Sequence, residues 1–160
     1  RRYVARITQV PPQEIDDLLQ DIFIKVYQNL HAFDASFPFS SWIYRIARNT
    51  AISAHRKRVV RPELQIIDSQ AGLGELADDL DIEADLRQRE LHEELGFALT
   101  GLRPDYQEVL ILRFFEDKSY EEMSDIMMKP SGTIATLLNR AKTALRKELV
   151  ARHTKTFHEH

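Results

Sequence analysis

The sequence contains no cysteine, only five glycines and six prolines, and a single tryptophan in 160 residues. The absence of cysteine excludes a disulfide scaffold and a cysteine-ligated zinc finger, and it suits a reducing compartment. No apolar run approaches the roughly 20 residues of a membrane-spanning helix. The sequence also lacks a glycine-rich phosphate loop, a nucleophile beside a general base and a pair of catalytic carboxylates, so we predict no enzymatic activity. The histidines form no recognisable set of ligands, and we predict neither a metal site nor a cofactor.

Charge is segregated along the chain, although the formal net charge is only −3. Residues 45–62 carry six basic side chains and no acid, whereas residues 63–86 carry eight acids and no lysine or arginine. Residues 140–155 are mainly basic again. Such a chain can bind a polyanion locally while it remains acidic overall.

Apolar residues at three- and four-residue spacing predict an all-α protein of two small helical modules. The first module spans residues 1–62, with a helix at about 13–30 whose apolar face we expect to be buried, and a second helix that Ser40 or Ser41 would cap. Residues 63–84 have no sustained period and are interpreted as a flexible acidic linker. The second module spans residues 85–152, and a tail follows at 153–160. Arg1 lies in a stretch that is typical of the end of a helix, so we expect a further segment before it.

Residues 119–149 have the pattern of a helix–turn–helix. Ser119 and Glu122 have the spacing of a capping box, a turn follows at 128–130, and Ser131 is placed to cap a longer helix with a basic side. A short helix that braces a longer one is the arrangement that reads the DNA major groove. The candidate contacts on the longer helix are Ser131, Thr133, Thr136, Asn139 and Arg140 for bases, and Lys142, Arg146 and Lys147 for phosphates. An ordinary helical hairpin with a solvated basic face explains the same pattern equally well.

Aromatic residues gather around the start of the second predicted helix, and basic or amide residues follow them. The aromatic set is Phe33, Phe37, Phe39, Trp42 and Tyr44, and the polar set is Arg45, Arg48, Asn49, Arg56, Lys57 and Arg58. Aromatic faces stack on unpaired bases while cations hold the backbone, which is how single strands are bound. Phe39 and Trp42 are equally well explained as core residues, and Phe37 is the better candidate for exposure. The acidic side of the first long helix is most often a solvated surface.

Three stretches, in this order, resemble the extracytoplasmic-function (ECF) sigma factors of the sigma-70 family. Residues 14–27 (EIDDLLQDIFIKVY) are similar to that family's polymerase-binding helix, and residues 39–49 (FSSWIYRIARN) to its promoter-melting segment. Residues 119–127 (SYEEMSDIM), 131–134 (SGTI) and 139–142 (NRAK) are similar to its −35-reading helix–turn–helix. The resemblance implies a cytoplasmic, non-enzymatic protein that binds core RNA polymerase and directs promoter-specific transcription initiation. It also implies an anti-sigma factor as inhibitor, commonly a membrane-anchored one.

The resemblance also implies a role for each candidate residue. Residues 1–62 would be sigma region 2 and residues 85–152 sigma region 4, with the linker along the RNA-exit path. The contacts to the clamp helices of the largest polymerase subunit would be Asp16, Asp17, Gln20 and Asp21. The loop at 34–39 would form a pocket for a base flipped out of the −10 element. The −10 contacts would be Asp34, Phe37, Trp42, Arg45, Arg48, Asn49, Arg56, Lys57 and Arg58. The −35 contacts would be Ser131, Thr133, Thr136, Asn139, Arg140, Lys142 and Arg146.

The sequence departs from the family pattern in the second module. No charged residue occurs between Thr133 and Arg140, so the −35 sequence cannot be predicted from relatives. The turn contains no glycine. Leu137 and Leu138 cannot both face a core, so we expect one of them at the surface, where it is a candidate contact for a partner protein. The main alternative is a stand-alone helix–turn–helix regulator, which would bind duplex DNA without polymerase and dimerise. A nucleic-acid-modifying enzyme is a second alternative, but the sequence has no catalytic set.

Overall fold

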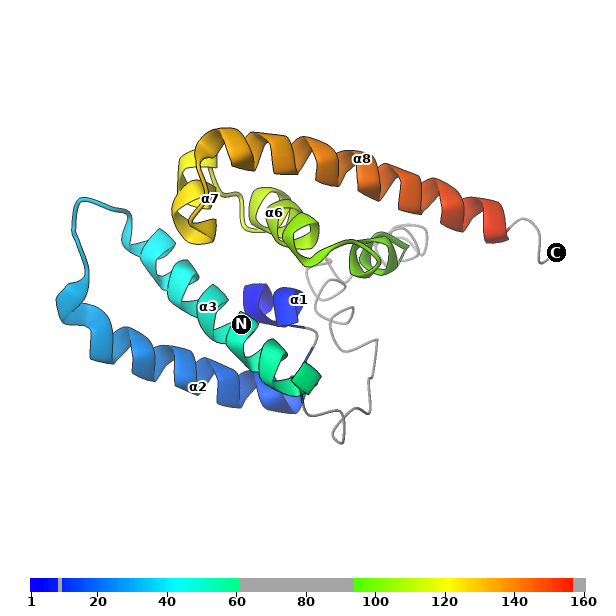
Figure 1. The fold of residues 1–160 in the computed structure, drawn as a ribbon. Helices are drawn as coiled ribbons and strands as arrows, with labels where there is room; N and C mark the ends of the chain where they lie inside the picture. Colours follow the sequence, from blue (N-terminus) through cyan, green and yellow to red (C-terminus); the bar gives the residue numbers. More distant parts are fainter. Residues whose placement is uncertain (9, 61–93, 157–160) are drawn as a thin grey trace, which may run out of the picture.

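The computed structural model describes residues 1–8, 10–60 and 94–156, which are mostly helical (Figure 1). The elements are α1 (Arg2–Thr8), α2 (Pro12–Asn29), the 3-10 helix η1 (Leu30–Ala32), α3 (Phe39–Val60), α6 (Pro104–Phe114), α7 (Tyr120–Met127) and α8 (Ser131–Thr156). Residues 94–100 form a further helical stretch. Within these ranges no strand occurs, and the predicted all-α fold is confirmed. The predicted linker at 63–84 lies outside the described residues.

Prolines mark where several helices begin. Pro12 and Pro104 occupy the first turns of α2 and α6, where the missing proline N–H would have no partner in any case. The carbonyl of Pro38 accepts the Trp42 N–H at 3.2 Å, so α3 begins at Phe39. The carbonyl of Pro130 accepts the Ile134 N–H at 3.0 Å, so α8 begins at Ser131. The expectation that serine side chains cap these two helices is therefore wrong, because the serines already lie within the first turn.

The prediction that the whole apolar face of α2 is buried is correct only as far as Ile22. Ile15, Leu18 and Ile22 are buried, whereas Phe23 and Tyr27 are 68% and 82% exposed. The reason is geometric. The two long helices of the first module, α2 and α3, diverge toward the loop that joins them, so α3 covers only the early turns of α2 (Figure 1). The later turns of α2 leave an apolar surface open to solvent.

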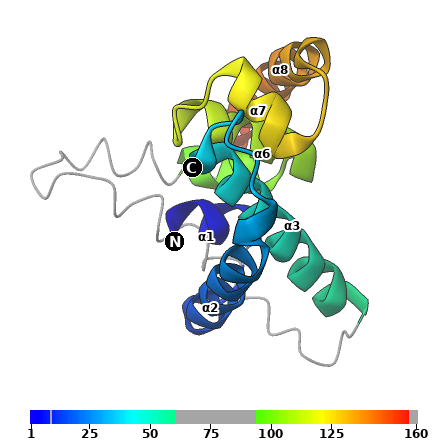
Figure 2. The same ribbon diagram turned by 90° about the vertical axis from the view of Figure 1, so that its left-hand side faces the viewer.

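The two parts of the chain pack directly on each other. We call residues 1–60 the amino-terminal half and residues 94–156 the carboxy-terminal half. Helix α1 lies between α3 and α6, and α3 also contacts α7 (Figures 1 and 2). One cluster of buried residues draws on both halves, including Val4 and Ala47 from the first and Leu112, Met123 and Met127 from the second. The halves therefore share one hydrophobic core.

Candidate nucleic-acid interface

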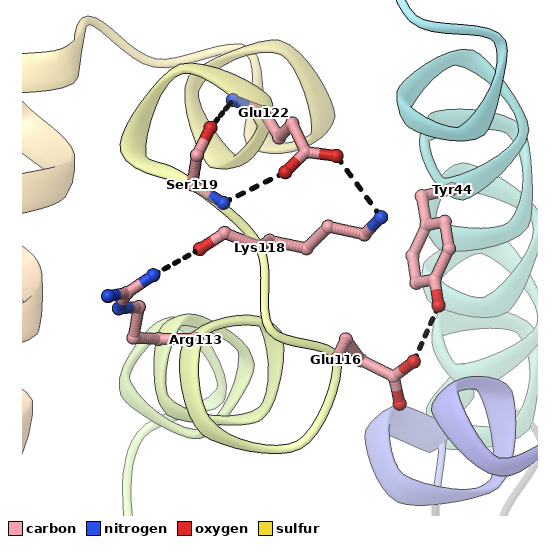
Figure 3. Close-up of polar contacts among 6 residues, drawn as sticks. All are labelled: Tyr44, Arg113, Glu116, Lys118, Ser119 and Glu122. Atoms are coloured by element: carbon pink, nitrogen blue, oxygen red, sulfur yellow. Dashed lines mark hydrogen bonds and ion pairs between the residues drawn. The ribbon is translucent and has the colours of Figure 1, made fainter.

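The start of α7 is fixed by the predicted capping box, which the structure confirms (Figure 3). The Ser119 hydroxyl accepts the Glu122 N–H at 3.1 Å, and the Glu122 carboxylate accepts the Ser119 N–H at 2.9 Å. Lys118 donates to the same carboxylate at 3.2 Å. The hydrogen bond from the Ser119 N–H lowers the pKa of Glu122 below its ordinary value, with Lys118 as a further cause. The reciprocal bonds satisfy backbone donors that the first turn of a helix leaves unpaired.

The turn between α7 and α8 is made without glycine. Met128 ends α7 in the left-handed conformation, with φ 54° and ψ 46°. Its N–H and that of Lys129 both donate to the Ser124 carbonyl, the latter at 3.1 Å, and the Ser124 hydroxyl donates to the Lys129 carbonyl at 2.6 Å. A left-handed residue with a side chain is strained, and the side chain of Met128 is 68% exposed. The hydrogen bonds hold a conformation that the sequence does not favour.

Helix α8 separates its core residues cleanly from its predicted DNA contacts. Ile134, Leu138 and Ala141 are buried against the other helices. The seven predicted −35 contacts are all exposed: Ser131, Thr133, Thr136, Asn139, Arg140, Lys142 and Arg146. Leu138 enters the core, and Leu137 is half-buried at its edge. One side of α8 is thus a continuous polar surface, braced from behind by α7.

The aromatic residues around the start of α3 are packed on one another. The Trp42 ring lies 5.3 Å from that of Phe33 and 5.6 Å, stacked, from that of Phe39. Trp42 is only 9% exposed and belongs to the core, whereas Phe37 is 52% exposed, as its position predicts. Asp34 accepts the Ser36 N–H at 2.9 Å, which lowers the pKa of the carboxyl group. The loop is therefore built on an aromatic base and presents Phe37 and Asp34 to solvent.

The basic and amide residues of α3 do not form one free surface. Asn49, Arg56 and Lys57 are exposed and Arg45 is half-buried. Arg48 instead reaches the carboxy-terminal half and donates from Nε to the Glu108 carboxylate at 2.5 Å. Arg58 lies in α3, but its side chain is outside the described part of the structure.

The acidic side of α2 is a separate surface. The four predicted polymerase contacts, Asp16, Asp17, Gln20 and Asp21, are all exposed. Asp16 also forms an ion pair with Arg1. The exposed apolar residues Phe23 and Tyr27 follow on the same helix. The helix therefore presents acidic residues in its first half and apolar ones in its second.

Two carboxylates of the carboxy-terminal half bind side chains of the amino-terminal half, and sequence reasoning missed both. Glu108 is 6% exposed and accepts hydrogen bonds from Arg48 and from the Tyr3 hydroxyl, the latter at 3.2 Å. Glu116 accepts from Arg6 at 3.1 Å. It also accepts from the Tyr44 hydroxyl at 2.5 Å (Figure 3). Burial and the neighbouring Glu116 raise the pKa of Tyr44 well above its ordinary value. The only signal in the sequence was one acid, Glu108, beside the apolar run of α6.

Comparison with known proteins agrees with this arrangement. The Sigma-70 region 2 family model matches residues 1–60, and the Sigma-70, region 4 model matches residues 92–145. The ECF RNA polymerase sigma factor SigW of Bacillus subtilis is 32% identical over 143 residues, which cover 85% of this chain and 75% of that protein. The chain belongs to the ECF sigma factors. Residues 119–149 had two interpretations, a DNA-reading helix–turn–helix and an ordinary helical hairpin. Family membership favours the first, because residues 119–145 lie within the region 4 match.

One further relative and two solved structures are also similar to this chain over most of its length. The ECF RNA polymerase sigma-E factor of Haemophilus influenzae is 29% identical over 153 residues, covering 92% of this chain and 78% of that one. The solved structure of the sigma factor RpoE with the anti-sigma factor NepR from Bartonella quintana has a TM-score of 0.70 at 24% identity, covering 92% of this chain and 88% of that chain. CnrH in complex with the cytosolic domain of CnrY gives 0.65 at 21%, covering 94% and 80%. A sigma factor directs core RNA polymerase to promoters, so the sigma-factor interpretation is confirmed over its alternative, the stand-alone regulator. In the part of the chain that the structure describes, no helix is long and apolar enough to cross a membrane.

Proposed function

We propose that this sigma factor reads the −35 element with the polar side of α8 and the −10 element with the loop before α3. The observation that carries the proposal is the separation on α8, where all seven predicted contacts are exposed and Ile134, Leu138 and Ala141 are buried. Thr136, Asn139 and Arg140 are the base-reading candidates, because an amide can pair with adenine and a guanidinium with guanine. Lys142 and Arg146 would hold phosphates.

The loop at 34–39 would receive a base flipped out of the −10 element. Phe37 is exposed at its tip, and Phe33 and Phe39 support the loop on Trp42. Extruding a base costs a few kcal/mol, and a shaped aromatic pocket offsets that cost only for a base that fits. In this proposal Trp42 shapes the pocket from below, while Arg45, Asn49, Arg56 and Lys57 hold the melted strands, with Arg48 and Arg58 as further contacts.

Helix α2 would dock on the clamp helices of the largest polymerase subunit. Its polar residues Asp16, Asp17, Gln20 and Asp21, three of them acidic, are exposed together, and Phe23 and Tyr27 beyond them are apolar and solvent-facing. Exposed apolar residues next to a charged rim are typical of a protein–protein contact. Substituting Phe23 and Tyr27 should therefore weaken polymerase binding without unfolding the chain.

An inhibitor and a cellular location can also be proposed for this sigma factor. RpoE, which shares this fold, was solved with the anti-sigma factor NepR, and CnrH, which also shares it, was solved with the cytosolic domain of CnrY. We propose that a membrane-anchored anti-sigma factor also controls this sigma factor. The sigma factor itself would act in the cytoplasm and have no enzymatic activity of its own. We further propose that region 2 extends over 1–62 and region 4 over 85–152, with an acidic linker at 63–84 along the RNA-exit path and a tail at 153–160.

Transcription from a genomic promoter library tests the function. Core RNA polymerase would be assayed with and without this chain, and the start sites mapped. Transcripts that appear only when the chain is present, with common −10 and −35 sequences, are the expected result. If core polymerase neither binds the chain nor gains start sites, the proposal is wrong.

A further inference from the structure

The two turns that flank α7 contain no glycine, although each has a residue with positive φ. Asp117 has φ 49° in the turn between α6 and α7, and Met128 has φ 54° in the turn between α7 and α8. Residues other than glycine rarely adopt this left-handed conformation, because their Cβ then crowds the following carbonyl oxygen. Contacts elsewhere in each turn must therefore hold it in place.

Each turn is held by a side chain that donates to a carbonyl five residues later, across the left-handed residue. The Arg113 guanidinium donates to the Lys118 carbonyl at 2.9 Å in the turn before α7 (Figure 3). The Ser124 hydroxyl donates to the Lys129 carbonyl at 2.6 Å in the turn before α8. Arginine and serine have little in common except a hydrogen-bond donor. The repeated spacing therefore indicates that a donor at this position is what a turn without glycine requires.

Ser124 joins the end of α7 to the start of α8. Its backbone carbonyl accepts the N–H of Met128 and, at 3.1 Å, that of Lys129. Its hydroxyl bonds the Lys129 carbonyl, which belongs to the peptide unit that enters Pro130. The Pro130 carbonyl in turn accepts the Ile134 N–H in the first turn of α8, at 3.0 Å. One residue thus holds both the last turn of α7 and the peptide from which α8 begins.

We propose that Ser124 is a positioning residue for −35 reading, whose hydroxyl fixes the direction of α8 relative to α7. The inference rests on the proposed function of α8 and deepens it by adding a residue that acts on the DNA contacts through the turn. A hydrogen bond to a base edge weakens steeply with misalignment, so a small rotation of α8 would impair base reading by Thr136 and Asn139. Flexible lysine side chains would still reach phosphates. Loss of the hydroxyl therefore lowers discrimination between −35 sequences more than it lowers overall affinity.

Substitutions at Ser124 and Met128 test this hydrogen bond together. Ser124→Ala removes the hydroxyl, and Ser124→Thr keeps it. Met128→Gly removes the need for it, because glycine adopts a positive φ without the Cβ penalty, so it should restore in Ser124→Ala what that variant loses. Ser53→Ala is the matched control, since the Ser53 hydroxyl also donates to a carbonyl, that of Asn49 at 2.8 Å, but within α3. Circular dichroism verifies that each variant is folded.

Two measurements separate the turn from its role in DNA reading. Amide hydrogen exchange in the full chain, without polymerase or DNA, reports how often the N–H groups of Met128 and Lys129 open. The affinity of the polymerase holoenzyme for promoter duplexes is measured with the −35 sequence mapped in the transcription assay, and with single base substitutions in it. The ratio of these affinities is the −35 discrimination.

We expect Ser124→Ala to speed exchange at Met128 and Lys129 and to lower the −35 discrimination by about two- to tenfold, the factor that one hydrogen bond typically supplies. Ser124→Thr and the double variant Ser124→Ala with Met128→Gly should discriminate as the unaltered chain does, and Ser53→Ala should change neither quantity.

Unchanged exchange in Ser124→Ala would show that the hydroxyl does not hold the turn, and the proposal would be overturned. Faster exchange with unchanged discrimination, or with an equal loss of affinity for every −35 sequence, would overturn the positioning role. The exchange measurement needs neither polymerase nor promoter. A failure of the proposed sigma function in the transcription assay is therefore distinguishable from a failure of the Ser124 hydrogen bond to hold the turn.

Discussion

Replacing Met128 with glycine should stabilise the protein, although it removes a large side chain. Met128 has φ 54°, in the left-handed region, and its side chain is 68% exposed, so little packing is lost. The left-handed conformation costs an L-residue with a Cβ roughly 1–2 kcal/mol, and glycine avoids that cost. Glycine loses about 0.5–1 kcal/mol more conformational entropy on folding. The net gain expected for Met128→Gly is therefore about 0.5–1 kcal/mol in the free energy of unfolding.

Urea unfolding, followed by circular dichroism, measures the change. A gain of this size corresponds to a rise of roughly 1–4 °C in melting temperature for a chain of this length. Lys129→Gly is the matched control, since Lys129 is the adjacent residue and does not have a positive φ. That variant should lose stability, by up to about 1 kcal/mol. If Met128→Gly is destabilised as much as Lys129→Gly, the turn is not strained and the reasoning is refuted.

Three further results are expected. The pKa of Glu122 is lowered in the folded chain. The stability that the capping box contributes is therefore present above the ordinary glutamate pKa of 4.5 and is lost as pH falls through the lower folded pKa. Glu122→Gln should remove this part of the acid dependence of urea unfolding. The pKa of Tyr44 is raised, so its contribution to holding the halves together is complete below about pH 10 and is lost as pH rises toward the folded value. The free energy of unfolding in urea should fall over that alkaline range, and less so in Tyr44→Phe. In DNA binding by the polymerase holoenzyme, Asn139→Ala should cost about 1–3 kcal/mol at one −35 position only, whereas Lys142→Ala should weaken all sequences alike and lower the salt dependence.

Local patterns in the sequence were sufficient for the helices and for one side of the site. The capping box was predictable because both of its hydrogen bonds join residues three apart, and Asn139 could be placed beside the buried face of α8 by helical period alone. The extent of α2 was predictable in the same way. The exposure of Phe23 and Tyr27 was not, because an apolar residue facing an absent partner has the same spacing as one in a core.

Contacts between distant parts of the chain could not be predicted from periodicity. Glu108 meets Arg48 across 60 positions and Tyr3 across 105. Nothing local distinguishes a glutamate that accepts from a remote arginine from one that faces solvent. The packing of the two modules on each other could not be predicted either, since a linker's composition says nothing about how the units that it joins pack.

The core that the halves share has a consequence for heat denaturation. Because α1 and α3 bury residues against α6 and α7, neither half can melt without exposing the other's apolar surface. The protein should therefore absorb heat in one cooperative transition, whose calorimetric and van't Hoff enthalpies agree. A chain whose halves have separated should instead melt in two smaller steps. A cavity made at Leu112 in α6 should therefore lower the temperature at which α3 unfolds as well. Helix α3 (Phe39–Val60) lies far from Leu112 in the sequence, but the two share one core.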